Sequence, residues 1–295
     1  MTEIHAFAGS TLCAATLELG EGPTYDAVTD TLWWFNIKGK QLHALDLATG
    51  DKSVHALPMM ASVLARIDDA RQLLVTEDGL FIRDTASGAL TPYVAIEPDK
   101  PGNRSNDGRM HPSGALWAST MGKKAETGAG AIYHVAGSRV TRLFDNLSIP
   151  NAICFSPDGR TGYFVDTVVN QLMHVDLDPS TGLPTGAPSV LIDRSAEDGG
   201  MDGAVCDAEG RIWNACWGQG AVDVYSAQGT HLARYDVPAQ QSSCPVFFGK
   251  DADRMAVTSA AEGYDAAALA SDPKAGHTFD LGIAVPGVLD VAFKL

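Results

Sequence analysis

An apolar run, a short polar turn and a second, alternating apolar run follow one another repeatedly along the chain. The clearest copy is AICFSPDGRTGYFV, from Ala152 to Val165, in which a Pro-Asp-Gly turn separates the two runs. This pattern is typical of a β-hairpin, because Gly and Asp accept the backbone angles of a tight turn. Five further copies, two of them close and three looser, begin at Met110, Ala204, Tyr25, Ala65 and Phe247.

The hairpins recur at a regular spacing of roughly 45 residues, which is the period of a propeller blade. Each is followed by a second pair of short strands, such as QLHALDLATG from Gln41. Four short strands per unit predict a β-propeller. Six units account for nearly the whole sequence, so we expect an all-β, six-bladed β-propeller that forms a single domain over residues 1–295. The six turn centres fall near Val28, Asp69, Ser113, Asp158, Glu209 and Asp251.

One strand-like segment lies outside this repeat. The stretch TLCAATLEL, which begins at Thr11, precedes the first hairpin. We expect it to pair with strands near the C-terminus, because that pairing would close the ring and remove an exposed sheet edge. Helical periodicity is not sustained anywhere, and only the Ala-rich stretch from Ala260 suits one short helical turn.

Polar residues recur seven positions before the turn centres. The first strand of every propeller blade lines the central channel, so a fixed offset from the turn predicts a common height in that channel. Four of the six residues at this offset are carboxylates or carboxamides, although Asn and Asp are also common as ordinary turn-forming residues. The six are Glu21, Ser62, Asn106, Asn151, Asp202 and Cys244.

Two carboxylates and two amides that meet on one axis predict a cation between them. Like charges held close together either raise the pKa of one group or require a positive charge nearby. Carboxylate and amide oxygens suit hard or borderline divalent ions. We therefore expect one divalent metal ion as a cofactor, with Ca²⁺, Zn²⁺, Mn²⁺ and Mg²⁺ as the candidates.

Composition and missing motifs exclude several other classes of protein. The net charge is −15, with 36 acidic and 21 basic residues, so nucleic acids and anionic membranes are not expected partners. No HExxH, GxSxG, GxGxxG or GxxxxGK motif occurs. The chain has no apolar run of about 18 residues, and its five cysteines form no CxxC pair. A signal peptide is not expected, because Glu3 stands near the start and no basic segment does. A cytoplasmic monomer with reduced thiols is the expectation.

Several of the segments named above match one known family. The sequence resembles the SMP-30/gluconolactonase family, also called the regucalcin-like lactonases. The matching motifs are spread over about two thirds of the chain, in the order of the family. They are LGEGP from Leu19, NRSNDG from Asn103, WASTMG from Trp117, IPNAICFSPDGRTGYFVDT from Ile149 and DGAVCDAEGRIWNACWGQG from Asp202.

The resemblance implies a six-bladed propeller that hydrolyses aldonolactones with one divalent metal ion. By that resemblance, Glu21, Asn151 and Asp202 match the metal ligands, and Asp202 also matches the general base. Asn106 matches a residue that contacts the substrate or a bound water, and Arg104 matches one that binds substrate oxygens.

Two departures from the family pattern bear on the substrate. Met201 stands where a proline often precedes the catalytic aspartate. After WASTMG the chain has Lys123 and Lys124, where mammalian members carry acidic residues. We interpret Lys124 as a substrate-binding residue that favours a lactone with a carboxylate, such as an aldarolactone.

The predicted function is metal-dependent hydrolysis of a sugar lactone, either an aldono- or an aldarolactone, to the corresponding acid. The metal would act as a Lewis acid and Asp202 as the general base. A metal-bound hydroxide as the attacking group is the alternative to a water activated by Asp202. Two other functions remain open: a non-catalytic, metal-binding propeller, and a promiscuous esterase or phosphotriesterase, since fold alone does not fix function.

Overall fold

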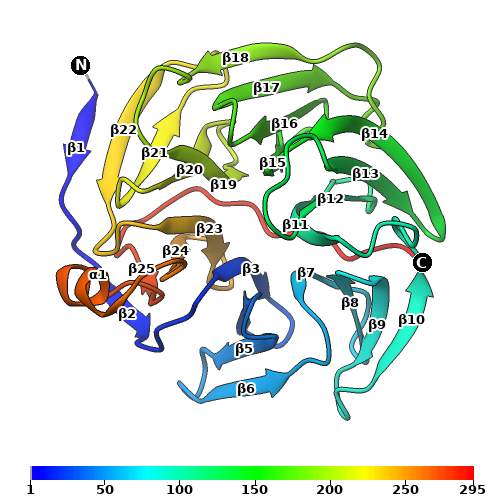
Figure 1. The fold of residues 1–295 in the computed structure, drawn as a ribbon, viewed down its shortest axis with the longest axis horizontal. Helices are drawn as coiled ribbons and strands as arrows, with labels where there is room; N and C mark the ends of the chain where they lie inside the picture. The colour runs from blue at the N-terminus through cyan, green and yellow to red at the C-terminus, as the bar shows by residue number, and fades with distance from the viewer. Residues whose placement is uncertain (1) are drawn as a thin grey trace.

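Six sheets are arranged around a central axis in the computed structural model, which describes residues 2–295 (Figure 1). Within each sheet, strands that follow one another in the sequence pair side by side and antiparallel, and two of the sheets also contain a strand from the N-terminal segment. The first strands of the six sheets contact one another in a closed ring around the channel. The predicted six-bladed β-propeller is therefore confirmed, and all six predicted hairpin turns join the first and second strands of a blade.

The blades are numbered here in chain order, and their strands run from the channel outward. The first blade contains β3 (Gly20–Asp26), β4 (Thr31–Asn36), β5 (Gln41–Asp46) and β6 (Lys52–Ala56). The second contains β7 (Ala61–Arg66), β8 (Arg71–Thr76), β9 (Gly79–Asp84) and β10 (Leu90–Val94). The third contains β11 (Asn103–Met110), β12 (Leu116–Gly122), β13 (Gly130–Ala136) and β14 (Arg139–Leu147). The fourth contains β15 (Pro150–Phe155), β16 (Thr161–Asp166), β17 (Gln171–Asp176) and β18 (Ser189–Asp193). The fifth contains β19 (Gly200–Cys206), β20 (Ile212–Trp217), β21 (Ala221–Tyr225), β22 (His231–Asp236) and β1 (Glu3–His5). The sixth contains β23 (Ser242–Phe248), β24 (Arg254–Ser259), β25 (Thr278–Asp280) and β2 (Ser10–Cys13).

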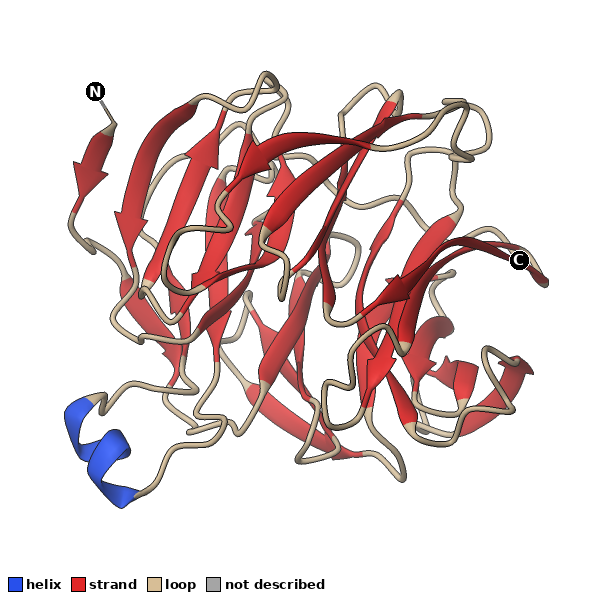
Figure 2. Ribbon diagram, turned by 45° about the horizontal axis from the view of Figure 1, so that its top comes forward, coloured by secondary structure: helices blue, strands red, loops and turns tan. Residues whose placement is uncertain are grey.

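The N-terminal segment closes the ring, as the sequence predicts. Strand β2 pairs antiparallel with β25, with Ser10 opposite Asp280. Strand β1 adds a pairing that the sequence does not predict, because it lies parallel to the outer strand β22 of the fifth blade. The predicted helical turn is α1 (Ala266–Ser271), whose N-terminus is capped by the Asp265 carboxylate and which lies at the rim (Figure 2).

Every first strand contains a β-bulge near its beginning. In β3 the register breaks between Glu21 and Thr24, and in β15 it breaks between Asn151 and Cys154. The other four first strands have the same irregularity close to their starts. An unpaired bulge residue bends the strand and re-aims a side chain. The bulges therefore mark the end of the channel at which the predicted polar residues lie.

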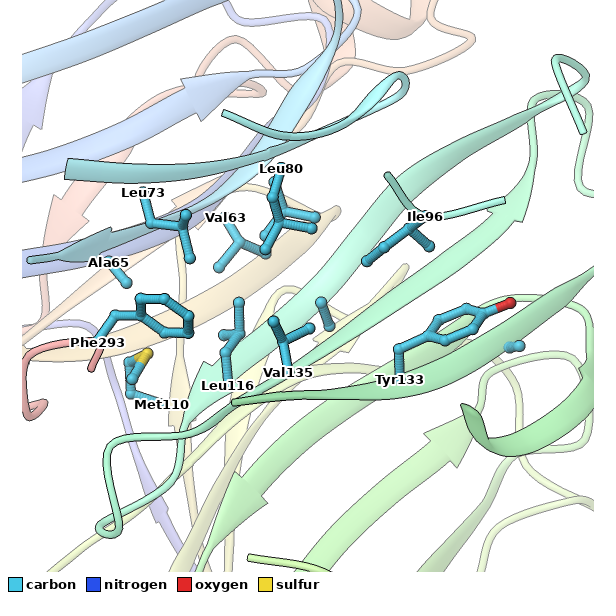
Figure 3. Close-up of a cluster of buried hydrophobic side chains, with 13 residues drawn as sticks. Val63, Ala65, Leu73, Leu80, Ile96, Met110, Leu116, Tyr133, Val135 and Phe293 are labelled. Carbon is cyan, nitrogen blue, oxygen red and sulfur yellow. The ribbon is translucent and has the colours of Figure 1, made fainter. Parts of the chain in front are cut away.

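Apolar side chains fill the spaces between blades. One such cluster joins the second and third blades and contains Leu73, Met110 and Leu116 (Figure 3). Phe293, from the end of the chain, is buried in the same cluster. Burying a side chain of this size contributes roughly 1.5–3 kcal/mol of transfer free energy. The last residues are thus part of the core that holds these two blades together.

The chain after β25, residues 281–295, is named here the C-terminal segment, and it crosses the middle of the disc (Figure 1). It is bound first by the sixth blade, where the Val285 N–H donates to the Asp253 carbonyl at 3.0 Å, and then by the fifth, where the Ala208 N–H donates to the Pro286 carbonyl at 2.8 Å. Asp290 then pairs with Arg109 of β11 at 3.2 Å, and the Phe293 N–H donates to the Arg66 carbonyl at 2.7 Å. A cavity of about 220 Å³ separates the segment from the last residues of the first strands. The segment therefore covers the end of the channel opposite the bulges.

The cysteines are free thiols, and all five lie within the described part of the chain. Cys216 is fully buried, and burial raises its pKa to about 12, so its thiol is neutral and donates to the Asp223 Oδ2 at 3.1 Å. No helix in residues 2–295 combines the length and the apolar character needed to cross a membrane.

Candidate active site

The structure brings together the four polar residues that the sequence places at one height. Glu21, Asn106, Asn151 and Asp202 lie on the first strands of blades one, three, four and five. The Asn106 Nδ2 donates to the Asn151 Oδ1 at 2.8 Å. The charge of Glu21 raises the pKa of Asp202, so these two carboxylates are within electrostatic reach of each other. Together they form the axial cluster.

The bulges show that these residues occupy two kinds of position. Glu21 and Asn151 directly precede the bulges of β3 and β15. Asn106 and Asp202 are the first residues of the bulges in β11 and β19. The uniform offset counted from the hairpin turns therefore corresponds to two adjacent register positions, and the bulge is what brings both to the channel.

The first bulge residue after Glu21, and likewise after Asn151, has a left-handed backbone. Gly22 and Ala152 both have φ of +52°. Such a conformation costs an alanine about 1–2 kcal/mol, whereas glycine adopts it readily. Ala152 is fully buried, so surrounding packing holds it in this conformation. Local strain of this kind is common where a functional side chain must be directed.

A third carboxylate, Asp107, lies beside the cluster and was not predicted. Its Oδ1 accepts from the Gly108 N–H at 2.8 Å, and its Oδ2 accepts from the Ile153 N–H of the next blade at 2.7 Å. Glu21 likewise accepts from the N–H of the glycine that follows it, at 2.9 Å. A carboxylate followed by glycine occurs at Glu21, Asp107 and Asp202, but the same dipeptide also occurs in hairpin turns such as Asp158-Gly159, so it does not identify Asp107 by itself.

The carboxylates of this region leave an excess of negative charge at the channel end. Burial raises the pKa of Glu21 to about 8. The hydrogen bond from the Gly22 N–H lowers this pKa, and the negative charge of Asp107 raises it. Burial also raises the pKa of Asp202 well above its usual range, and the charges of Glu21 and Asp107 raise it further. Arg104 is the positive side chain that lowers the pKa of Glu21. A cation at this place would relieve the repulsion.

A chain of hydrogen bonds fixes the orientation of both amides. The Arg104 Nη1 donates to the Asn106 Oδ1, and the Asn106 Nδ2 donates to the Asn151 Oδ1, both at 2.8 Å. The Asn151 Nδ2 donates to the Thr167 Oγ1 at 3.0 Å, and that hydroxyl donates to the Met201 carbonyl at 2.7 Å. Since a threonine hydroxyl has one proton, its bond to Met201 leaves it an acceptor for Asn151. Sequence analysis did not single out Thr167.

The donor set of the axial cluster fits a hard divalent cation. Within residues 2–295 no three His, Cys, Asp or Glu side chains are arranged to hold a metal ion. A metal at the axial cluster would therefore combine the carboxylates of Glu21 and Asp202 with the Asn151 Oδ1, whose amide nitrogen is committed to Thr167. Oxygen ligands of this kind are those that Ca²⁺, Mg²⁺ and Mn²⁺ prefer.

Arg104 is buried beside the cluster and retains free donors. Its Nη1 binds the Ser105 carbonyl and the Asn106 Oδ1, both at 2.8 Å. Its other guanidinium nitrogens have no hydrogen-bond partner within the described residues. An arginine with uncommitted donors next to a carboxylate cluster is suited to bind the oxygens of a small polar molecule.

The two lysines after β12 differ in their surroundings. Lys123 pairs with Glu77 at 2.6 Å and donates to the Pro101 carbonyl at 3.0 Å. Lys124 is exposed, and its side chain contacts no partner in the part of the chain that the structure describes. The strand before these lysines pairs Met121 with Arg104, so they lie at the cluster end of the channel. The structure does not bring Lys124 into contact with the axial cluster.

The fold and the axial cluster define a β-propeller enzyme with an oxygen-rich site at one end of its channel. The chain belongs to the SMP-30/gluconolactonase/LRE-like family, because the sequence model of that family matches residues 19–261. The family that the sequence predicts is therefore confirmed.

Individual relatives cover the whole propeller. A candidate sugar lactone lactonase of Rhizobium meliloti (strain 1021) is 60% identical over 295 residues, 100% of both chains. The L-arabinolactonase of Azospirillum brasilense is 36% identical over 285 residues, 95% of this chain and 93% of the relative. The crystal structure of regucalcin, a calcium-binding protein from Agrobacterium tumefaciens str. C58, superimposes with a TM-score of 0.99 at 59% identity and covers 100% of both chains. The predicted enzyme class, a lactonase, agrees with the names of these relatives.

Proposed function

We propose that this chain is a metal-dependent lactonase that opens a sugar lactone to the corresponding acid. The observation that carries this proposal is the axial cluster itself, in which the half-buried Glu21 and the buried Asp202 are within electrostatic reach of each other and hydrogen bonds orient the Asn151 amide. Relatives named sugar lactone lactonase and L-arabinolactonase support the substrate class.

Glu21, Asn151 and Asp202 would hold the metal ion. When bound, the cation supplies Lewis-acid polarisation of the lactone carbonyl. The calcium-binding relative favours Ca²⁺ as the first ion to test, with Zn²⁺, Mn²⁺ and Mg²⁺ as the alternatives.

Asp202 is the proposed general base. Its carboxylate accepts a proton from the water that attacks the lactone carbonyl carbon. The ring C–O bond then breaks, and the proton passes to the released hydroxyl oxygen. General-base assistance of this kind contributes about 10²–10⁴-fold in rate. Arg104 and Asn106 would hold the ring hydroxyls and fix the direction of attack, since Arg104 has uncommitted donors.

Lys124 is the proposed specificity residue for an acidic substrate. Its exposed ammonium lies at the cluster end of the channel, on the turn after the strand that pairs with Arg104. A carboxylate at the far end of an aldarolactone would be attracted to this charge. The attraction is modest because an exposed pair is screened by water.

Metal replacement tests the proposed function directly. The protein is stripped with a chelator, and Ca²⁺, Mg²⁺, Mn²⁺ or Zn²⁺ is restored separately while acid release is followed from a panel of aldono- and aldarolactones and one aryl ester. We expect release that requires a metal and prefers one lactone. Comparable rates on the aryl ester would indicate a promiscuous esterase, and no release from the folded protein would indicate a non-catalytic binding protein.

Substitution of the base tests the role of Asp202. Asp202→Asn should lower kcat by at least about 10²-fold, since it removes the proton acceptor. The matched control is Asp178→Asn, an exposed turn residue whose carboxylate binds Ser180. A fully active Asp202→Asn enzyme would overturn this assignment.

A further inference from the structure

Asn214 is a fully buried amide on β20, next to the bulge that contains Asp202. Its Nδ2 donates to the Asp202 carbonyl at 2.8 Å and to the Gly203 carbonyl at 3.2 Å. The β19–β20 register passes from Met201 opposite Cys216 to Ala204 opposite Asn214. Asn214 therefore binds the carbonyls of both bulge residues, Asp202 and Gly203.

Side chains hold three successive carbonyls around Asp202. Thr167 binds the carbonyl of Met201 at 2.7 Å, and Asn214 binds those of Asp202 and Gly203. From the other side, β23 closes on the bulge, because a Cβ added to Gly203 would lie within 2.4 Å of the Cys244 Sγ. The peptide planes on both sides of Asp202 are thus fixed by contacts from blades four, five and six.

The other end of the Asn214 amide makes this residue type costly. Its Oδ1 is buried and has no hydrogen-bond partner within residues 2–295. A buried acceptor left without a partner costs roughly 1–3 kcal/mol. Leucine has nearly the same size and would leave no such acceptor. The unpartnered Oδ1 therefore lowers the stability of the fold. The favourable hydrogen bonds of this side chain are the two that its Nδ2 makes to the bulge carbonyls.

We propose that Asn214 is a positioning residue that directs the Asp202 carboxylate into the axial cluster by binding the two bulge carbonyls. This inference rests on the proposed function, in which Asp202 is both a metal ligand and the base. Residues that orient a metal ligand through hydrogen bonds typically change metal affinity or activity by about 10–100-fold when they are replaced. The same range is expected here.

The test compares Asn214→Leu with a matched control, Gln72→Met. Gln72 is also a buried amide on the second strand of a blade, but its Oε1 accepts from Arg83, away from the channel. Calorimetry with Ca²⁺ and Mn²⁺ alone gives the metal Kd, lactone hydrolysis gives kcat and KM, and thermal unfolding shows that each variant folds. Asn214→Ser, which is smaller and introduces no new volume, decides the matter if the leucine variant does not fold.

Asn214→Leu and Asn214→Ser should raise the metal Kd by about 10–100-fold and lower kcat, whereas Gln72→Met should change stability only. Metal Kd and kcat within twofold of the wild type for folded Asn214 variants would refute the positioning role. The proposed function fails in a different way: the wild-type protein itself would bind no cation, or Asp202→Asn would bind and turn over like the wild type.

Discussion

Gly22 and Ala152 share one left-handed backbone conformation, with φ of +52° in both, in blades on opposite sides of the channel. Each directly follows a residue of the axial cluster, Glu21 in one case and Asn151 in the other. Their surroundings differ, because a Cβ added to Gly22 would lie 1.9 Å from the Ser62 carbonyl oxygen of the next blade. The same left-handed backbone therefore accommodates an alanine, Ala152, in blade four. In blade one it has room only for a glycine, Gly22.

Gly22→Ala should therefore be much more disruptive than its φ alone implies. We expect a loss of more than about 2 kcal/mol in the free energy of unfolding, since the clash adds to the conformational cost. Gly50→Ala is the control, because Gly50 also has a positive φ, +79°, but an added Cβ would contact nothing within 4 Å. Denaturant unfolding of both variants measures the difference. Equal losses would show that the Ser62 carbonyl gives way.

Thr167→Val should weaken the site without unfolding the protein. Valine has nearly the same shape but neither accepts from the Asn151 Nδ2 nor donates to the Met201 carbonyl. The Asn151 amide would then be free to turn, and we expect metal affinity and kcat/KM to fall by roughly 10-fold. Thr167→Ser keeps the hydroxyl and should restore most of both. Metal titration and steady-state kinetics of the two variants decide the point.

Lys124→Glu should change the choice of substrate and leave the chemistry intact. Reversing the charge at the rim would disfavour a lactone with a carboxylate by about two- to tenfold in kcat/KM, a size set by screening of an exposed charge. The rate on a neutral aldonolactone should stay the same. If the preference between neutral and acidic lactones did not change, Lys124 would have no role in specificity.

Glu97 predicts a defined dependence of stability on pH. Burial alone would raise its pKa, but hydrogen bonds from Lys100, Asn103 and Tyr133 outweigh burial and lower it. A lowered folded pKa means that this stabilisation is complete above the unfolded pKa and is lost as the pH falls through the folded value. Glu97→Gln should cost about 1–3 kcal/mol at pH 7 and less in acid. Urea unfolding at pH 7 and pH 4 measures this, and an equal cost at both would contradict it.

Phe293→Ala should detach the C-terminal segment. Replacing a buried phenylalanine by alanine typically costs about 3–5 kcal/mol, but here the loss cannot exceed the free energy of docking the segment. We expect lower stability and rapid trimming by carboxypeptidase, which acts on released chain ends. Leu295→Ala is the control, because Leu295 is exposed. Resistance to trimming in the Phe293 variant would show that the Asp290–Arg109 pair holds the segment by itself.

The blades were predictable because neighbouring residues alone, a turn between two apolar runs, specify each hairpin. The Pro-Asp-Gly turn that ends at Gly159 and the alternation around it specify two paired strands without reference to the rest of the chain. The axial residues were predictable for the same reason, since repetition of the unit places equivalent residues at nearly the same height. The family resemblance added the roles of Glu21, Asn151 and Asp202.

Other features depend on contacts between blades, which local pattern does not contain. Counting back from a turn does not reveal a bulge, so the roles of Thr167, which binds the carbonyl just before the β19 bulge, and of Asn214, which binds the carbonyls within it, could not be inferred. Asp107 was missed because it lies one position past the counted offset. The parallel pairing of β1 with β22 joins a three-residue strand to an outer edge and leaves no periodic signal.

The C-terminal segment has a kinetic consequence for the proposed reaction. It covers one end of the channel, held there by the Asp290–Arg109 pair, while the axial cluster lies at the other end. With that end covered, we expect molecules to reach and leave the proposed site from the cluster end. The acid product and the next lactone would then use the same passage and bind the same site, so the product should act as a competitive inhibitor.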